Sequence, residues 1–118
     1  MLKNTYHEYK EDIAVIYIGK DLMEKLAACA EEVAEKNGVK AAVLDFKDVG
    51  LISSSPIGQV LLAYDYLYQK GIDIYLCNTR NEREQPFRVL ELIGLPSFPG
   101  VNVRETLEET LKELSAKN

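Results

Sequence analysis

The sequence is poor in the residue types that most often carry chemistry. Its 118 residues include one histidine, two cysteines and no tryptophan. Two cysteines are too few for a disulfide framework or a four-cysteine metal site, and one histidine cannot complete a zinc pair. We therefore expect a protein of the reducing cytoplasm that binds no metal ion.

Patterns that bind nucleotides or build active sites are also missing. None of the seven glycines falls in a GxGxxG or GxxxxGK[ST] spacing, so no loop is predicted to cradle a phosphate. Nucleophilic catalysis by serine or cysteine needs a nearby imidazole, and the only histidine, His7, falls in a predicted edge strand, where we expect it in solvent. The sequence thus predicts no cofactor and no catalytic residue, and it argues against an enzyme.

One enzymatic alternative stays open at the end of a predicted central strand. Asp45 and Asp48 flank this strand end, which is where open α/β sheets bind ligands. Together with the serines at positions 53–55, these carboxylates would need a pocket that perturbs their pKa values. Most other acidic residues follow the outer faces of predicted helices, where we expect them in solvent.

Acidic residues outnumber basic ones. Nineteen aspartates and glutamates stand against 14 lysines and arginines, a formal net charge of −5 at pH 7. This excess disfavours binding to nucleic acid or acidic lipid. The longest apolar run, Ile13 to Ile18, is too short to cross a bilayer. We expect protein partners, no nucleic acid and no direct membrane insertion, and the sequence leaves the oligomeric state open.

Short apolar runs alternate with longer amphipathic ones, which is typical of an α/β domain with a largely parallel sheet. No linker or repeat divides residues 1–118, so we expect a single domain. A tight turn at Glu11 and Asp12 predicts an antiparallel first pair of strands. The sequence therefore predicts a mixed, mostly parallel sheet of four to five strands. The predicted strands are Thr5–Lys10, Ile13–Ile18, Ala41–Phe46, Ile72–Leu76 and Val101–Val103.

Four helices are predicted between and after these strands. The first begins at Asp21, whose carboxylate would form a capping box with Glu24, and Gly38 would supply its left-handed exit. Cys29 falls on the apolar face of this helix, so we expect it in the core. The second helix runs from Pro56 to Lys70.

The third predicted helix ends at Gly94, and its start is not defined by the sequence, because Pro86 fits only a first helical turn. The last helix opens with a second capping box, Thr106 and Glu109. Its apolar residues are expected to point inward: Leu107, Leu111 and Leu114.

The segment before the second helix is the most informative part of the chain. Pro56 suits a first helical position and directs Ser55 toward the conformation of an N-cap. In the simplest interpretation the Ser55 hydroxyl only caps the helix, and its loss costs ~1 kcal/mol.

The second helix is predicted to carry two stripes of side chains. The core stripe consists of Ile57, Val60, Leu61, Tyr64, Leu67 and Tyr68. On the opposite side Ser55, Gln59, Leu62 and Tyr66 follow at steps of four, three and four, which places them on one face that the sheet does not cover. An uncovered leucine and tyrosine indicate a docking surface, but single exposed apolar residues are also common.

Two segments resemble STAS domains, the fold of bacterial anti-sigma-factor antagonists and of sulphate-transporter tails. One runs from Ala42 to Leu62, and the other is Val89–Leu95 followed by Thr106–Glu109. The family motif reads approximately Asp-Ser-Ser-Gly-Leu-Gly, and its second serine matches Ser55. Ser53 stands where the family has aspartate, and Pro56 stands where it has glycine.

The resemblance implies a regulatory module that is not an enzyme. In antagonists of this family, a partner kinase that is also the anti-sigma factor phosphorylates the serine that matches Ser55. We expect Ser55 to be the phosphoacceptor and the second helix to dock the partner. The residues predicted to bind this partner are Ser53, Ser54, Pro56, Gln59, Leu62, Tyr66, Arg80 and Arg83.

Arg80 and Arg83 follow a parallel strand whose end should lie at the same sheet edge as Ser55. They would neutralise a phosphate or contact an acidic partner, unless they are simply solvated among Glu82 and Glu84. A second interpretation of the whole chain is a constitutive scaffold, or a small cytoplasmic subunit of a stress-signalling or lipid-transport complex, without phosphorylation. The departures at Ser53 and Pro56 favour it.

Overall fold

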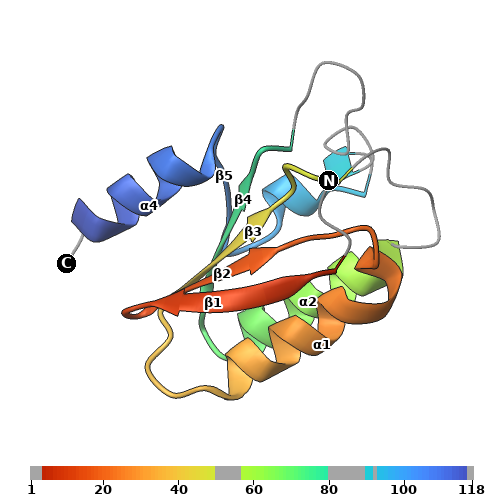
Figure 1. Cartoon of the computed structure of the whole chain (residues 1–118), viewed down its shortest axis with the longest axis horizontal. Helices are drawn as coiled ribbons and strands as arrows, with labels where there is room; N and C mark the ends of the chain where they lie inside the picture. Colours follow the sequence, from red (N-terminus) through yellow and green to blue (C-terminus); the bar gives the residue numbers. More distant parts are fainter. Residues whose placement is uncertain (1–3, 50–56, 80–89, 92, 117–118) are drawn as a thin grey trace.

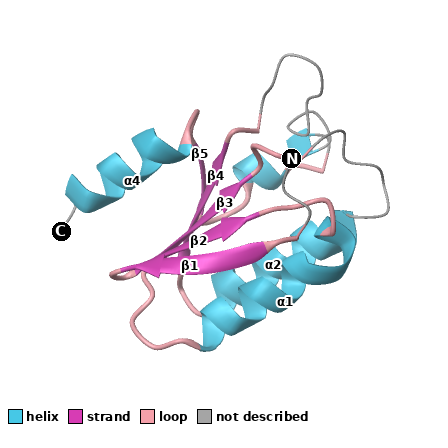
Figure 2. Cartoon of the chain, in the orientation of Figure 1, coloured by secondary structure: helices cyan, strands magenta, loops and turns pink. Residues whose placement is uncertain are grey.

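A five-stranded sheet lies between two helices on one face and a single helix on the other in the computed structural model, which describes residues 4–49, 57–79, 90–91 and 93–116. Figure 1 shows α1 and α2 together on one side of the sheet and α4 on the opposite side, and Figure 2 shows the same layers by secondary structure. The elements in chain order are β1 (Tyr6–Lys10), β2 (Ile13–Tyr17), α1 (Leu22–Glu35), β3 (Ala41–Asp45), α2 (Ile57–Gln69), β4 (Asp73–Cys77), the 3-10 helix η1 (Leu95–Ser97), β5 (Val101–Val103) and α4 (Leu107–Ala116).

The strands lie in the sheet in their sequence order. β1 pairs antiparallel with β2, and every later pair is parallel, which confirms the predicted mixed sheet. Crossovers between parallel strands are right-handed, so connections that advance in one direction place their helices on one face. This rule explains why α1 and α2 lie side by side.

Both faces of the central strands are buried, and their residues alternate between two core clusters. In β3, Ala42 and Leu44 face α1 and α2, whereas Ala41 and Val43 face α4. Strands covered on both faces have apolar residues at successive positions. The continuous apolar runs in the sequence were therefore correctly interpreted as central strands.

The number of helices differs from the prediction. The described residues contain three α-helices and the short helix η1. Of the predicted helix that ends at Gly94, Leu90 and Glu91 are helical, and the range 80–89 lies outside the described residues. Gly94 has a φ of 80°, a left-handed conformation that favours glycine at a helix end.

Asp21 begins α1 as predicted, but its side chain does not cap the helix. Its Oδ1 instead accepts hydrogen bonds from the backbone N–H and the hydroxyl of Thr5, both at 2.7 Å. The Thr5 hydroxyl in turn accepts a hydrogen bond from the Gly19 N–H at 3.0 Å. The Asp21 carboxylate thus accepts hydrogen bonds from Thr5, before β1, and not from the first N–H groups of α1. The predicted capping box at Asp21 is therefore wrong.

The expectation that His7 is solvated is also wrong. Its side chain is only 17% exposed, and its Nε2 lies 3.5 Å from Oε2 of Glu32 on α1. The ring also packs edge-on against Tyr9. Although β1 is an edge strand, the face that carries these two rings packs against α1, which removes both from bulk solvent.

The buried face of α2 is rotated relative to the predicted stripe. Its fully buried residues are Val60, Ala63 and Leu67, whereas Tyr68 is 46% exposed. The prediction was correct for Val60 and Leu67 and wrong for Tyr68. The cause is α1, which packs along one side of α2 and shifts the buried face toward Ala63.

Candidate functional site

The candidate site is the carboxyl edge of the parallel sheet, where β3 and β4 end next to each other. Asp45, the last residue of β3, is only 7% exposed. Its Oδ1 accepts a hydrogen bond from the Lys47 N–H at 3.0 Å and another from Nδ2 of Asn78 at 2.8 Å. One carboxylate therefore joins the ends of the two strands that precede the predicted site segments.

Most of the predicted site residues lie in those two segments. Residues 50–56 and 80–89 are outside the described residues, so the roles assigned to their side chains stay predictions. The residues concerned are Ser53, Ser54, Ser55, Pro56, Arg80 and Arg83.

The other three predicted partner-binding residues lie on α2, and they do not form one exposed stripe. Gln59 Oε1 accepts a hydrogen bond from the Ala27 N–H of α1 at 3.1 Å. Tyr66 is half-buried against the core, and its hydrogen bond with Glu31 raises the pKa of its phenol. Leu62 is 42% exposed. The predicted stripe is wrong because α1, and not only the sheet, covers this side of α2.

The enzymatic alternative combines Asp45 and Asp48 with the serines at positions 53–55, which lie outside the described residues, so it stays a prediction. Both carboxylates line a cavity of about 550 Å³. The hydrogen bonds of Asp45 assign its carboxylate to holding strand ends together.

Both thiols are unsuited to nucleophilic chemistry. Burial and the neighbouring Asp45 carboxylate raise the pKa of Cys77 to about 12. Burial and Glu32 also raise the pKa of Cys29, which packs against the core. The reactive form of cysteine is the thiolate, so both side chains act as small core residues at neutral pH.

Within the described ranges, no three histidine, cysteine or acidic side chains gather as ligands for a metal ion. In the same part of the chain, every helix is too short or too polar to span a bilayer.

The family model for the STAS domain matches residues 3–113. The chain belongs to the STAS domain family. No curated protein sequence matches it.

Solved structures share the fold of this STAS domain at low sequence identity. SpoIIAA of Bacillus, a cell fate determinant solved in its phosphorylated form, is 19% identical with a TM-score of 0.68, and 94% of this chain and 99% of that one are covered. A putative anti-sigma factor antagonist from Thermotoga maritima is 18% identical with a TM-score of 0.69 and 92% coverage of both chains. A STAS protein from Planctomyces limnophilus is 13% identical with a TM-score of 0.73, covering 96% and 98%.

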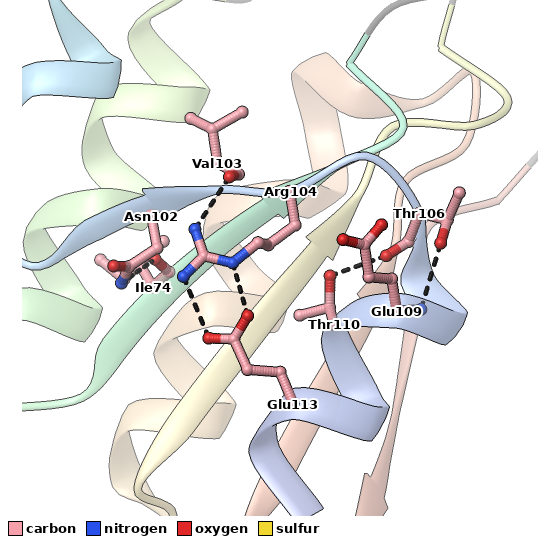
Figure 3. Close-up of polar contacts among 8 residues, drawn as sticks. All are labelled: Ile74, Asn102, Val103, Arg104, Thr106, Glu109, Thr110 and Glu113. Atoms are coloured by element: carbon pink, nitrogen blue, oxygen red, sulfur yellow. Dashed lines mark hydrogen bonds and ion pairs between the residues drawn. The ribbon is translucent and has the colours of Figure 1, made fainter.

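No pattern in the sequence predicts how this STAS domain holds its last helix. Arg104, directly after β5, donates from Nε and Nη2 to the two carboxylate oxygens of Glu113 on α4, at 2.7 and 3.0 Å (Figure 3). Its guanidinium also lies 5.4 Å from the ring centroid of Tyr75. At the start of α4, the Thr106 hydroxyl accepts a hydrogen bond from the Glu109 N–H at 3.1 Å, as predicted for a cap.

Proposed function

We propose that this STAS domain is a non-enzymatic cytoplasmic module that regulates a partner protein by binding it. The proposal is carried by the family match over residues 3–113, together with a serine, Ser55, at the position of the family's phosphorylated serine. The proposed partner is an anti-sigma factor that is also a serine kinase. It docks on Ser55 and α2 and phosphorylates Ser55.

The exposed side of α2 supports this docking surface. Leu62 is one of three large hydrophobic side chains exposed in the described part of the chain. Seven residues, or about two helical turns, separate Leu62 from Ser55, so the proposal places both residues toward the same side of the helix axis. Gly58, between them, is also exposed.

Phosphorylation of Ser55 would act through charge alone. It adds about −1.5 to −2 charges at neutral pH, and a position before a helix tolerates them because the free N–H groups and the helix dipole favour an anion. A partner that covers the neutral hydroxyl would have to desolvate a dianion, which costs several kcal/mol without compensating arginines. A loss of ~3 kcal/mol weakens binding about a hundredfold.

Arg80 and Arg83 enter this proposal as sources of compensation. They follow β4, whose end is joined to the end of β3 through Asn78 and Asp45. In the proposal they neutralise a phosphate on Ser55 or contact an acidic part of the partner.

The test compares Ser55→Ala and Ser55→Asp with the native chain. We expect the native chain and Ser55→Ala to bind the isolated partner kinase, and Ser55→Asp to lose about a hundredfold in affinity at an unchanged thermal midpoint. Ser115→Asp, on the exposed side of α4, is the charge-matched control. Equal binding by Ser55→Ala and Ser55→Asp would refute the switch.

A second candidate is a constitutive scaffold or subunit without phosphorylation. Ser53 and Pro56 favour it, because both replace residues of the family motif next to the phosphoacceptor. Phosphopeptide mass spectrometry on protein isolated from stressed and unstressed cells separates the two candidates. Stress-dependent modification of Ser55 supports the switch, and its absence in both samples supports the scaffold.

A further inference from the structure

A second exposed surface lies on the face of the sheet that carries α4, opposite α1 and α2 (Figure 1). There α4 packs on β3 and β4, and β1 lies beyond it. Tyr6 of β1 and Tyr17 of β2 are paired across the strands, and their rings stack with centroids 4.8 Å apart. Tyr6 is 47% exposed. A large aromatic side chain is thus held in a fixed position at the surface.

The tyrosine pair forms one wall of the cavity of about 550 Å³ that Asp45 and Asp48 also line. Leu107 and Glu108, from the first turn of α4, also line it. The cavity is therefore lined from β1, β2, the ends of β3 and β4 and the start of α4, and none of its described lining residues belongs to α2.

The charge of this cavity is negative. Its described lining carries three carboxylates, Asp45, Asp48 and Glu108, and one ammonium, that of Lys47, a balance of −2. The Tyr17 hydroxyl also donates a hydrogen bond to Glu8, whose charge is offset by Lys10 at 3.7 Å, so the negative balance rests on the three lining carboxylates. An aromatic face next to carboxylates attracts a cation both through the ring and through the opposite charge.

One observation and one chemical property select the kind of cation. The acidic side chains do not gather into a metal-binding cluster within the described ranges. A guanidinium group is planar, stacks on an aromatic ring and donates several hydrogen bonds in its plane, whereas an ammonium is a strongly hydrated point charge. The stacked tyrosines and the separate carboxylates therefore fit arginine better than lysine or a metal ion.

We propose that this cavity docks a basic segment of a protein partner, with an arginine side chain over the Tyr6 ring and its guanidinium directed toward Asp48 and Glu108. Among the described residues, the lining of this cavity shares none with α2.

The test uses the full chain and two short peptides that differ in one residue, with arginine in one and citrulline in the other. Citrulline keeps the planar shape and removes the charge. We expect the arginine peptide to shift the NMR ring signals of Tyr6 and Tyr17, with an affinity that falls as salt is raised. Citrulline should shift them far less. Equal shifts from the two peptides, or shifts confined to other tyrosines, would overturn the proposal.

Variants of the acidic residues sharpen the test. Asp48→Asn and Glu108→Gln should each weaken binding of the arginine peptide about threefold, as expected for partly exposed ion pairs. Asp73→Asn is the matched control, because Asp73 is an exposed aspartate at the opposite end of the strands. An equal effect of Asp73→Asn would show that only the net charge matters and would overturn the proposal.

Two further measurements distinguish this site from the proposed switch at Ser55 and from a polyamine site. Ser55→Asp should bind the arginine peptide as the native chain does, so a failure of the proposed switch leaves this proposal standing. Spermidine, a flexible polyamine, should compete weakly. Tighter binding of spermidine than of the arginine peptide would assign the cavity to a small polyamine and overturn the protein partner.

Discussion

The helical layers on the two faces of the sheet differ in size. In the described part of the chain, the cluster under α1 and α2 has 18 buried residues, whereas the cluster under α4 has seven. The first layer covers the sheet with two helices of 14 and 13 residues, and the second covers it with one helix of 10. Buried apolar area supplies most of the stabilisation, so the α1 and α2 layer contributes the larger share of it, and on the α4 face Tyr6 of β1 stays exposed.

The largest predicted effect tests this difference directly. Leu67→Ala, at a fully buried position of α2, should lower the free energy of unfolding by ~4 kcal/mol, because the α1 and α2 layer leaves little room for collapse around the cavity. Leu114→Ala, at the edge of the smaller cluster, should cost only ~2 kcal/mol. Urea denaturation measures both.

Leu62→Ala serves as the control on the same helix. Its side chain is 42% exposed, so the loss should stay below ~1 kcal/mol. Equal losses at Leu67 and Leu114 would contradict the difference between the two layers.

The second prediction concerns the attachment of β1. A Cβ atom at Gly19 would lie 2.7 Å from the backbone of Asn4, so Gly19→Ala should push the chain before β1 away and weaken the hydrogen bonds between Thr5 and Asp21. We expect a loss of ~2 kcal/mol and faster hydrogen exchange at the Thr5 amide.

Gly58→Ala is the matched control for Gly19→Ala. A Cβ at Gly58 meets no atom of the described residues within 4 Å, and alanine is the better helix former, so this change should stabilise the chain by up to ~1 kcal/mol. Unchanged exchange at Thr5 in Gly19→Ala would show that the close approach to Asn4 has no structural role.

The third prediction uses pH to probe Cys77, which lies under α4. Its pKa is raised from 9.0 to about 12 in the folded chain, so between these values the unfolded chain loses a proton that the folded chain keeps. The free energy of unfolding should therefore fall as the pH rises, by up to ~1.4 kcal/mol per pH unit from this group. In denaturation series from pH 8 to 10.5, Cys77→Ala should show a shallower decline. Identical slopes for both proteins would argue against a thiol shielded by α4.

The smallest predicted effect concerns the start of α4. Thr106→Ala removes the hydroxyl that accepts the Glu109 N–H and should cost ~1 kcal/mol, with faster amide exchange in α4 and unchanged exchange in α1. Ser115→Ala, at an exposed position of the same helix, should change stability by less than ~0.5 kcal/mol. Faster exchange in α1 as well would mean that the two layers open together.

The central strands were predictable because a strand that is covered on both faces has apolar residues at successive positions. The predicted central strands end within one residue of the observed β2 and β3. The cap at Thr106 was also predictable, since its donor lies three residues away. In each case the interaction that decides the structure is local or follows from the periodicity of the chain.

Features that depend on distant partners were not predictable in the same way. Asp21 has the sequence pattern of a cap, but its bonds go to Thr5, 16 residues earlier. The side of α2 that bears Tyr66 was expected to be open, and only the packing of α1 shows that it is not. The pair of Arg104 and Glu113 spans nine residues and a change from strand to helix, so no helical spacing rule would find it.

The residues of the candidate sites differ in the same way: some were predictable from their position in the sequence, and others depend on distant partners. Asp45 and Asp48 could be identified from their position at a strand end. The aromatic wall beside them could not, because Tyr6 comes from the far end of an antiparallel pair. The strand order of the sheet was needed to bring Tyr6 and Glu108 to one cavity.

The bidentate pair between Arg104 and Glu113 also has a mechanical consequence. A force applied at the C-terminus loads α4 first, and this pair and three leucines resist it before any strand is pulled. A force applied at the N-terminus is instead resisted first by the hydrogen bonds of Thr5 to Asp21, and β1 is loaded once they break. The two ends of this domain should therefore yield in different ways under tension, the C-terminal end by peeling of a helix and the N-terminal end by rupture of a strand.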